Sequence, residues 1–298
     1  MQAAVISEYG DPDVIVMREA PIPEPGRGEV LVRMAATTFN ASDTALRAGM
    51  LRDVLPLSPP FVPGWDIAGS IVALGAGVQG RVVGELVVGR VDAAGGAAEY
   101  AAVPAESLVP APRKVPLAHA AAIPVAGLTA WQAVYEYAHI ESGQRVLIVG
   151  AGGSVGIFAV QLAARVGAHV IATASSRSAA EVLAAGAEEV VDYTAGPLPG
   201  DVDVVLNLAP VSSDTAEWMA GLARTGVAVV SIATPVPAPE AVHFTARNDP
   251  RQLAELVALV DAGELSVAIT ESQPLTELSA VHRRSEAGGT RGNILLVP

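Results

Sequence analysis

The chain contains no cysteine. Its 298 residues can therefore form no disulfide bond, thiolate nucleophile or cysteine-bound metal site. Aromatic residues make up only 4% of the chain and charged residues only 16%, whereas 51% are hydrophobic, with alanine and valine dominant. Many small apolar side chains support a large core and suit close packing of helices on a sheet.

Basic residues are also scarce, with 18 Lys and Arg against 31 Asp and Glu and a net charge of −13. This charge disfavours nucleic acid and anionic membranes as partners. The apolar stretch 117–134 is interrupted by His119, Pro124 and Gly127, and no 18-residue uninterrupted apolar span exists. The N-terminus lacks the basic segment of a signal peptide. We therefore expect a cytoplasmic protein with no membrane partner.

Residues 1–112 are rich in short strand candidates separated by Gly/Pro turn clusters, a pattern typical of a barrel-like β domain. The expected strands are Ala3–Ser7, Glu29–Thr38, Asp66–Leu74, Arg81–Val88 and Ala98–Val103.

From about residue 114 strands alternate with helices, which predicts a doubly wound parallel sheet and an α/β fold class. The expected helices are Leu117–Ile123, Leu128–Ala138, Ser154–Val166, Ser178–Ala185, Asp214–Ala223 and Pro250–Ala262. The expected strands are Arg145–Val149, His169–Thr173, Glu189–Val191, Asp203–Leu208 and Gly226–Ile232. The final segment adds two expected strands, Val267–Ile269 and Asn293–Val297, with one expected helix, Thr276–Ser285, between them.

A glycine turn joins the strand Arg145–Val149 to the helix Ser154–Val166. This strand–turn–helix context is the one that a dinucleotide-binding fingerprint requires. Glycine lets the backbone approach a pyrophosphate, and the N–H groups at the start of the helix face its phosphates. The expected cofactor-binding residues here are Gly150, Gly152, Gly153, Ser154, Val155 and Gly156.

The loop after the next strand contains Ser175, Ser176 and Arg177 and no acidic residue. An NAD site usually places Asp or Glu there, whereas two hydroxyls and a guanidinium can bind a 2′-phosphate. This loop predicts NADPH as the cofactor. Ser176 is alternatively the N-cap of the following helix with Arg177 in solvent, and both interpretations can hold together.

Two further loops follow later strands, at the carboxyl edge where ligands bind in such sheets. We expect their backbone groups to hold the carboxamide of the nicotinamide. The residues are Asn207, Leu208, Ile232, Ala233 and Thr234.

The chain resembles the zinc-free quinone oxidoreductase branch of the medium-chain dehydrogenase/reductase superfamily over essentially its whole length. The motifs that carry this resemblance are Phe39–Asp43, Val62–Gly69, Gly95–Tyr100, Val125–Trp131, the glycine turn at 150–156, Asp192–Tyr193 and Gly289–Ile294. The resemblance implies a GroES-like catalytic domain, 1–113 completed by 263–298, and a Rossmann NADPH-binding domain, 114–262.

The resemblance also assigns individual residues. Tyr193 matches a tyrosine at the adenosine end of the cofactor, and Asn40 and Thr129 match positions near the nicotinamide half, which makes these two the candidate catalytic residues. Their alternatives are a turn residue and a hydroxyl at a helix start. The resemblance further implies a homodimer, which we expect to join through the Gly226–Ile232 strand because an unpaired edge strand would otherwise be exposed.

The zinc-dependent branch uses a cysteine near residue 38 and a Gly-His-Glu element, and this chain has Thr38 and Gly64-Trp65-Asp66 at those places. Its five histidines are scattered without ligand spacing. We therefore expect no metal. Asp66 is either an acid/base group or, as the resemblance implies, a structural residue.

No catalytic dyad is visible in the sequence. We expect an NADPH-dependent oxidoreductase that transfers a hydride to a small-molecule quinone or activated alkene without zinc. Two alternatives stay open: an enoyl reductase or dehydrogenase specific for one biosynthetic intermediate, and a non-enzymatic NADPH-binding sensor or structural protein.

Overall fold

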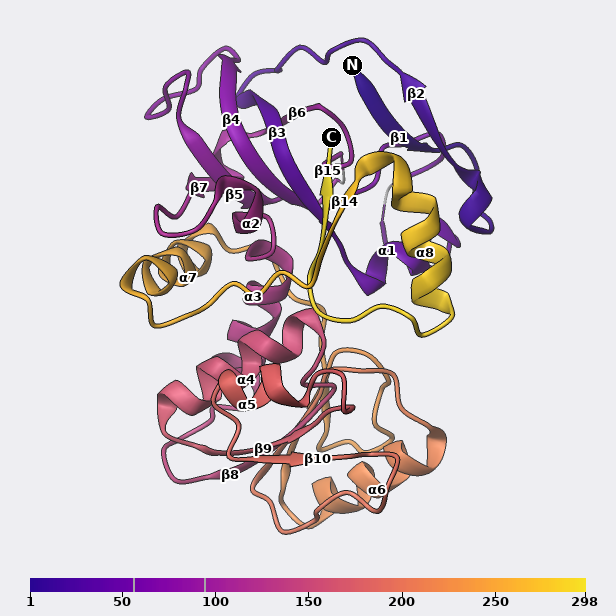
Figure 1. Cartoon of the computed structure of the whole chain (residues 1–298), viewed down its shortest axis with the longest axis vertical. Helices are drawn as coiled ribbons and strands as arrows, with labels where there is room; N and C mark the ends of the chain where they lie inside the picture. Colours follow the sequence, from indigo (N-terminus) through magenta and orange to yellow (C-terminus); the bar gives the residue numbers. More distant parts are fainter. Residues whose placement is uncertain (56, 94) are drawn as a thin grey trace. The chain divides into compact units, whose positions relative to one another are not determined.

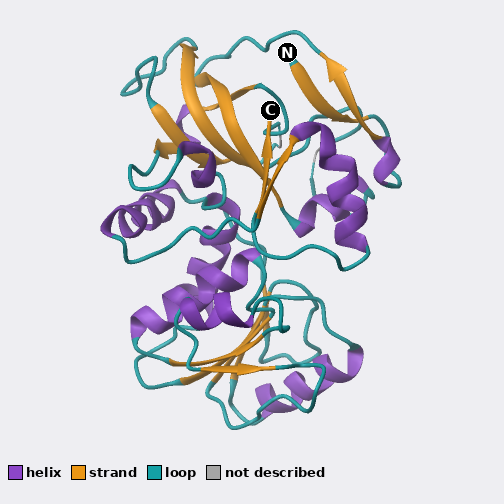
Figure 2. Ribbon diagram, viewed as in Figure 1, coloured by secondary structure: helices purple, strands orange, loops and turns teal. Residues whose placement is uncertain are grey.

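The computed structural model describes residues 1–55, 57–93 and 95–298. These residues form two compact units, Met1–Val125 with Asn248–Pro298, and Ala126–Arg247. Each unit is built on sheets of its own, as Figures 1 and 2 show.

The first unit is rich in strands and has two sheets. One sheet pairs β1 with β2, and the other runs in the order β14-β15-β3-β4-β5-β7, with β6 also paired to β3. The bounds are β1 Gln2–Ile6, β2 Ile15–Glu19, β3 Glu29–Phe39, β4 Asp66–Leu74, β5 Leu86–Arg90, β6 Tyr100–Pro104, β7 Leu108–Pro110, β14 Glu271–Pro274 and β15 Ile294–Val297.

Alternation of side chains along β3 and β4 builds the core of this unit. Val30 and Val32 face inward and pack with Ile71 of β4, as expected for a period of two. Gly69 of β4 lies so close to β3 that a Cβ there would be 2.2 Å from the carbonyl oxygen of Arg33. A larger residue at this position would separate the two strands.

The helices of the first unit come from both ends of the chain. They are α1 Ala41–Arg47, α2 Leu117–Ala120, α7 Pro250–Ala262 and α8 Leu278–Glu286. Helix α7 begins at a capping Asp249, ends at Gly263 with φ +80°, and packs against β7. The sequence prediction had placed α7 in the Rossmann domain. The C-terminal strand β15 pairs antiparallel with β3, so the last residues complete the first unit.

The second unit contains a six-stranded parallel sheet in the order β10-β9-β8-β11-β12-β13. This is the 3-2-1-4-5-6 order of a Rossmann sheet. The strands are β8 Arg145–Val149, β9 His169–Thr173, β10 Glu189–Val191, β11 Val204–Asn207, β12 Ala228–Ser231 and β13 Val242–His243. The helices are α4 Ser154–Val166, α5 Ala179–Ala184 and α6 Ser213–Arg224, preceded along the chain by α3 Pro124–Trp131 and a π-helical segment Gln132–Tyr137.

Three of the crossovers in this sheet carry a helix. Helices α4 and α5 cover one face, and α6 covers the other (Figures 1 and 2). The crossover from β10 to β11, residues 192–203, contains only turns and irregular backbone. Part of the α6 face is therefore covered by a loop alone.

The predicted α/β fold class, a β-rich unit plus a doubly wound parallel sheet, is confirmed. The expected strand Arg81–Val88 was wrong at its start, because Gly80 and Gly84 adopt positive φ and β5 begins only at Leu86. The expected strand Val267–Ile269 was also wrong, because the strand forms later, at Glu271–Pro274.

The structure also corrects the expected dimer edge. The predicted strand Gly226–Ile232 corresponds to β12, which is not at the edge of the sheet. Strand β13 pairs with it in parallel, with Val242 beside Val230. The short β13 follows the Pro-rich loop after β12, and its weak pattern gave no strand signal.

Candidate functional site

The glycine turn after β8 is held in a shape that only glycine fits. Gly150 has φ +83°, and a Cβ on it would lie 2.6 Å from the Cβ of Ala209. A Cβ on Gly156 would lie 2.3 Å from the carbonyl oxygen of Gly150. Helix α4 starts directly after Gly153, which offers no capping side chain. The first-turn N–H groups of Ser154 and its neighbours thus have no capping side chain, as is common at helix starts that bind anions.

The loop after β9 lies beside this turn, because a Cβ on Gly152 would be 2.4 Å from Oγ of Ser178. Ser175 is half-buried, while Ser176 and Arg177 are exposed. The alternative that Ser176 caps the next helix was wrong: α5 begins at Ala179, and the residue before it is Ser178. The carbonyl of Ser175 accepts the backbone N–H groups of Ser178 and Ala179.

The loops after β11 and β12 are joined by hydrogen bonds. Asn207 is fully buried, and its Nδ2 donates to Ser231 Oγ at 3.1 Å and to the carbonyl oxygen of Thr234 at 3.4 Å. The hydroxyl of Thr234 accepts the N–H of Val211 at 3.0 Å. The Asn207 side chain therefore fixes the shape of these loops, and its Oδ1 has no partner among the described residues. Leu208 donates its N–H to Val149, inside the same strand-end cluster.

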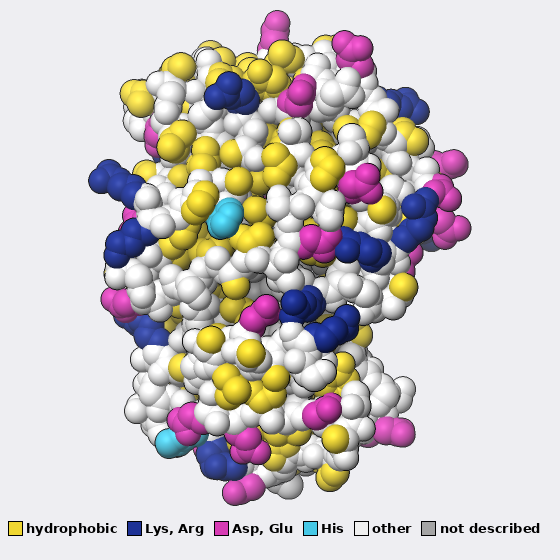
Figure 3. All heavy atoms as spheres, in the orientation of Figure 1, with side chains coloured by type: hydrophobic (Ala, Val, Ile, Leu, Met, Phe, Trp, Pro, Cys, Tyr) yellow, Lys and Arg dark blue, Asp and Glu magenta, His cyan; other side chains and the backbone are white. Residues whose placement is uncertain are grey.

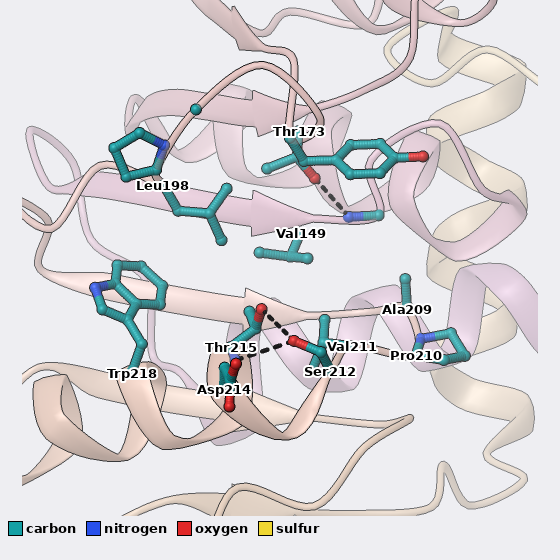
Figure 4. A pocket seen from close by; sticks show the side chains of 14 residues that line it. Val149, Thr173, Leu198, Ala209, Pro210, Val211, Ser212, Asp214, Thr215 and Trp218 are labelled. Carbon is teal, nitrogen blue, oxygen red and sulfur yellow. Dashed lines mark hydrogen bonds between the residues drawn. The ribbon is translucent and has the colours of Figure 1, made fainter.

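A cavity of about 600 Å³ opens at this carboxyl edge, between the loop 192–203 and the start of α6. Figure 4 shows Thr173 and Leu198 on one side, Val149 between the two sides, and on the other side Trp218 with Ala209, Pro210, Val211, Ser212, Asp214 and Thr215. Gly150 and the half-exposed Tyr193 also line it. Sequence reasoning found Gly150 and Tyr193 but missed Leu198 and Trp218. Neither of those two lies in a motif.

The first unit holds a buried network around two acids. Asp66 accepts hydrogen bonds from the hydroxyl of Thr38, from Nδ2 of Asn40 at 2.7 Å and from the N–H of Val125 at 2.9 Å. Asp43 accepts the backbone N–H of Asn40 at 2.8 Å. Asn40, the residue before α1, is thus held through its side chain by Asp66 and through its backbone N–H by Asp43.

Burial dominates the electrostatics of this network. It raises the pKa of Asp66 to about 6, although the hydrogen bonds it accepts act in the opposite direction. Burial raises the pKa of Asp43 to about 7, with a further contribution from the charge of Asp66. Sequence reasoning weighed Asp66 but missed Asp43, whose place in a capping pattern with Asn40 was the available signal.

Thr129 lies in α3 and is buried. It belongs to the second unit and Asn40 to the first. Three residues after Thr129, the fully buried Gln132 bonds the backbone of Arg247 through both its amide atoms. That pair joins the start of the second unit to its last residue.

The described residues contain no group of three or more His, Asp or Glu side chains placed to hold a metal ion. His282 is fully buried without a hydrogen bond to its ring among them, and burial lowers its pKa to about 3. None of the described helices is long and apolar enough to cross a membrane. On the face shown in Figure 3, the Lys and Arg side chains are interspersed with Asp and Glu.

A β-rich unit completed by the C-terminus, together with a Rossmann unit that carries this glycine turn, defines a medium-chain dehydrogenase/reductase. Residues 26–113 match the family model of the alcohol dehydrogenase GroES-like domain, and residues 185–296 match that of the zinc-binding dehydrogenases. The chain belongs to the quinone oxidoreductase branch of this superfamily.

Individual relatives agree with that placement. The chain is 40% identical to the chloroplastic quinone-oxidoreductase QR1 of Triphysaria versicolor over 59% of its own length, and spans 55% of that protein. It is 30% identical to the 2-methylene-furan-3-one reductase of Solanum lycopersicum, covering 100% of this chain and 79% of the relative.

Solved structures also resemble the whole chain. The quinone oxidoreductase from Coxiella burnetii has a TM-score of 0.89 at 28% identity, covering 100% of this chain and 99% of the other. A mycobacterial structure complexed with NADPH has a TM-score of 0.84 at 26% identity, with 100% of both chains covered.

Proposed function

We propose that the protein is an NADPH-dependent oxidoreductase that reduces a quinone or an activated alkene. The observation that carries the proposal is the glycine turn, where Gly150 and Gly156 leave no room for a Cβ and the start of α4 is open to an anion. The relatives named quinone oxidoreductase and furanone reductase support the substrate class. When bound, the cofactor would supply a hydride from its nicotinamide C4 to the electrophilic carbon of the quinone or enone, and water would supply the balancing proton.

Charge around the adenosine ribose favours NADPH over NADH. Ser175, Ser176 and Arg177 follow β9, and no acid stands among them to repel a 2′-phosphate. The exposed guanidinium of Arg177 can give charge-assisted hydrogen bonds to that phosphate. Tyr193, at the end of β10, is the fourth residue that we assign to this end of the cofactor.

We place the pyrophosphate of the cofactor at the glycine turn before α4. Backbone N–H groups of Gly152 and of the first turn of α4 (Ser154 and Val155) are the donors that we assign to the phosphates. Gly153 is assigned to the shape of the turn, because its N–H donates to the carbonyl oxygen of Gly150 at 3.1 Å. The backbone of Leu208, Ile232, Ala233 and Thr234 is assigned to the carboxamide. Asn207 acts indirectly, because its side chain bonds those loops internally.

Asn40 and Thr129 are the side chains that we assign to the reactants. Asp66 and Asp43 fix the orientation of Asn40, so it can donate or accept a hydrogen bond without rearranging. Neither Asn40 nor Thr129 titrates near neutral pH, so we assign them to orientation and not to proton transfer.

The mechanism needs no metal, because a quinone or enone is already electrophilic. Oxidising a saturated alcohol requires a Lewis acid or a base that removes the hydroxyl proton. Trp65 stands where the zinc-dependent branch has the histidine of its Gly-His-Glu element, and Thr38, at the place of the cysteine, donates its hydroxyl to Asp66. We propose a zinc-independent enzyme for which simple alcohols are poor substrates.

A panel of quinones, enones, enoyl thioesters and alcohols, followed at the NADPH absorbance, tests this function. We expect quinones and enones to be reduced, with full activity after chelation, and we expect the label of C4-deuterated NADPH on a carbon atom of the reduced enone. An enone product without the label, or alcohols oxidised faster than enones are reduced, would contradict the proposal. Activity with a single enone would favour the second candidate, a reductase specific for one metabolite, which the tomato relative supports.

A homodimer in the cytoplasm remains our expectation from the family. Light scattering at micromolar concentration tests the assembly, and a monomer would contradict it.

A further inference from the structure

A mostly buried arginine, Arg90, faces the Asp66 network from the neighbouring strand. In the antiparallel pair of β4 and β5 (Figure 1), Arg90 is the direct partner of Asp66. Residues directly opposite each other in such a pair project to the same face of the sheet, with Cβ atoms about 4.5–5.5 Å apart. The side chain of Arg90 is only 15% exposed, and Asp66 is buried. A guanidinium keeps its proton in a protein, so a permanent positive charge lies beside a buried carboxyl.

Two neighbours on the solvent side position Arg90. Its Nε lies 3.5 Å from Oδ1 of Asp92, and Nδ2 of Asn248 donates to its carbonyl oxygen at 2.8 Å. The Asp92 side chain is 65% exposed, and an ion pair with so exposed a partner contributes little to stability. The pair with Asp92 alone therefore does not account for burial of the guanidinium. Asp66, across the strand pair, is a second opposite charge that acts on it.

Asp66 can accept all three of its hydrogen bonds only as a carboxylate. The hydroxyl of Thr38, the amide of Asn40 and the N–H of Val125 all donate to its two oxygens. A protonated carboxyl carries an O–H donor of its own, so protonation would set two donors against each other. Burial raises the pKa of Asp66 to about 6, and the charge of Arg90 is among the causes that lower it. Loss of Arg90 would therefore raise this pKa further.

The other titratable groups around Asp66 cannot replace Arg90. Asp43, from α1, repels Asp66 when it is ionised, and its own pKa is raised to about 7, mainly by burial. His282, from α8, lines a small cavity together with Asp43, and burial lowers its pKa to about 3, so its ring is neutral near pH 7. The charge of the buried Arg47 acts on His282. The positive charge that acts on Asp66 is that of Arg90.

We propose that Arg90 is a positioning residue: its charge keeps Asp66 ionised near neutral pH, so that Asp66 holds the Asn40 amide in one orientation for the reactants. The part of this statement that concerns reactants rests on the proposed function. Arg90 acts through Asp66, and its loss should therefore have an effect on turnover that depends on pH and that requires Asp66.

The first experiment measures kcat for enone reduction against pH in the wild type and in Arg90→Met. Removing an opposite charge at this range raises the pKa of a carboxyl by about one pH unit or more. We therefore expect the two enzymes to agree within about twofold at pH 9 and the wild type to be about fivefold faster at pH 6. Arg90→Lys keeps the charge and should follow the wild-type profile. A loss of the same size at every pH, or no loss at any pH, would overturn the proposal.

Two further variants separate the charge of Arg90 from its packing. Arg33→Met makes the same change at an exposed position on β3 and should leave the pH profile unchanged. In an Asp66→Asn background, Arg90→Met should change kcat by less than about twofold at any pH, because the group through which it acts no longer titrates. A full additional loss in that background would contradict action through Asp66. Arg90→Gln serves if Arg90→Met does not fold, as judged by circular dichroism.

The second experiment observes Asp66 without substrate or cofactor. Carboxyl resonances of the full chain labelled with ¹³C-aspartate are followed by NMR against pH, and the one that is absent from Asp66→Asn belongs to Asp66. We expect its titration midpoint to lie about one pH unit or more higher in Arg90→Met than in the wild type and in Arg33→Met. An unchanged midpoint would overturn the proposal. A raised midpoint in a protein that reduces no quinone or enone would uphold the action of Arg90 on Asp66 and overturn the proposed function.

Discussion

The two units build their candidate sites from different materials. In the second unit the glycine turn presents backbone N–H groups, and its geometry depends on the absence of side chains at Gly150 and Gly156. In the first unit the site is made of side chains, with Asn40 held between Asp43 and Asp66. A backbone site is sensitive to added atoms, whereas a buried polar site is sensitive to the loss or charge of one partner. The following predictions test that difference.

The largest effect on cofactor binding is expected for Gly156→Ala in α4. The new Cβ would lie 2.3 Å from a backbone oxygen, so the turn must shift and the N–H groups move away from the phosphates. We expect NADPH affinity to fall at least ~100-fold, about 3 kcal/mol, measured by calorimetry.

Gly221→Ala in α6 is the matched control, because a Cβ there meets nothing within 4 Å. Alanine in an open helix position should raise the unfolding free energy by about 0.5–1 kcal/mol and leave NADPH binding unchanged. If both variants bind NADPH as the wild type does, the steric account of the turn is wrong.

The second prediction concerns pH and Asp43. Its pKa is raised from 3.8 to about 7 in the folded chain, so folding favours the protonated carboxyl. The resulting stabilisation is complete below the unfolded pKa and is lost as pH rises through 7. Relative to Asp43→Asn, which does not titrate, the wild type should lose on the order of 4 kcal/mol of unfolding free energy between pH 4 and 8. Urea denaturation at several pH values measures this difference.

Asp13→Asn, a carboxylate-to-amide change at an exposed position outside this network, supplies the control for that series. Added to both proteins, it should leave the pH dependence of the difference between wild type and Asp43→Asn unchanged. A difference between wild type and Asp43→Asn that stays constant with pH would contradict the role of burial.

These two sites also differ in how far the sequence could predict them. The glycine turn is a local pattern between a strand and a helix, and β8, α4 and β9 formed at the expected residues. The Asp66 network joins Asp66 to Thr38 and Asn40, 28 and 26 residues away in the chain, and to Val125, 59 residues away. Such partners become visible only when β3, β4 and the start of α3 are in place.

The cavity shows the same limit. Composition and periodicity gave no sign of it, because it results from a helix that the crossover 192–203 lacks. The edge strand β13 has only two residues, too few for a pattern, so the sequence placed the edge at β12. Long-range pairing and short elements are what sequence reasoning missed, and both are decided by tertiary packing.

The third prediction tests the side-chain site directly. Asp66→Asn keeps the size of the side chain but places an amide N–H₂ among three donors, so at least one contact becomes repulsive. We expect kcat to fall ~10–30-fold, about 1.4–2 kcal/mol, with KM for NADPH within threefold. Asn40→Ala removes the orienting side chain itself and should lower kcat about tenfold or more, at least as much as Asp66→Asn does. An Asp66→Asn enzyme with wild-type kcat would show that Asn40 needs no fixed orientation.

The smallest effect is expected at the exposed end of the backbone site. Arg177 is solvent-exposed after β9, so its charge-assisted bond to a 2′-phosphate is partly screened by water and salt. Wild type should bind NADPH at least about tenfold tighter than NADH, roughly 1.4 kcal/mol, and Arg177→Ala should remove most of that preference. Arg165→Ala, an exposed change in the last turn of α4, is the control and should keep it. Because a salt-screened contact weakens as ions are added, the preference should also shrink between 50 and 500 mM salt. Equal wild-type affinity for the two cofactors would mean that the loop 175–177 does not read the 2′-phosphate.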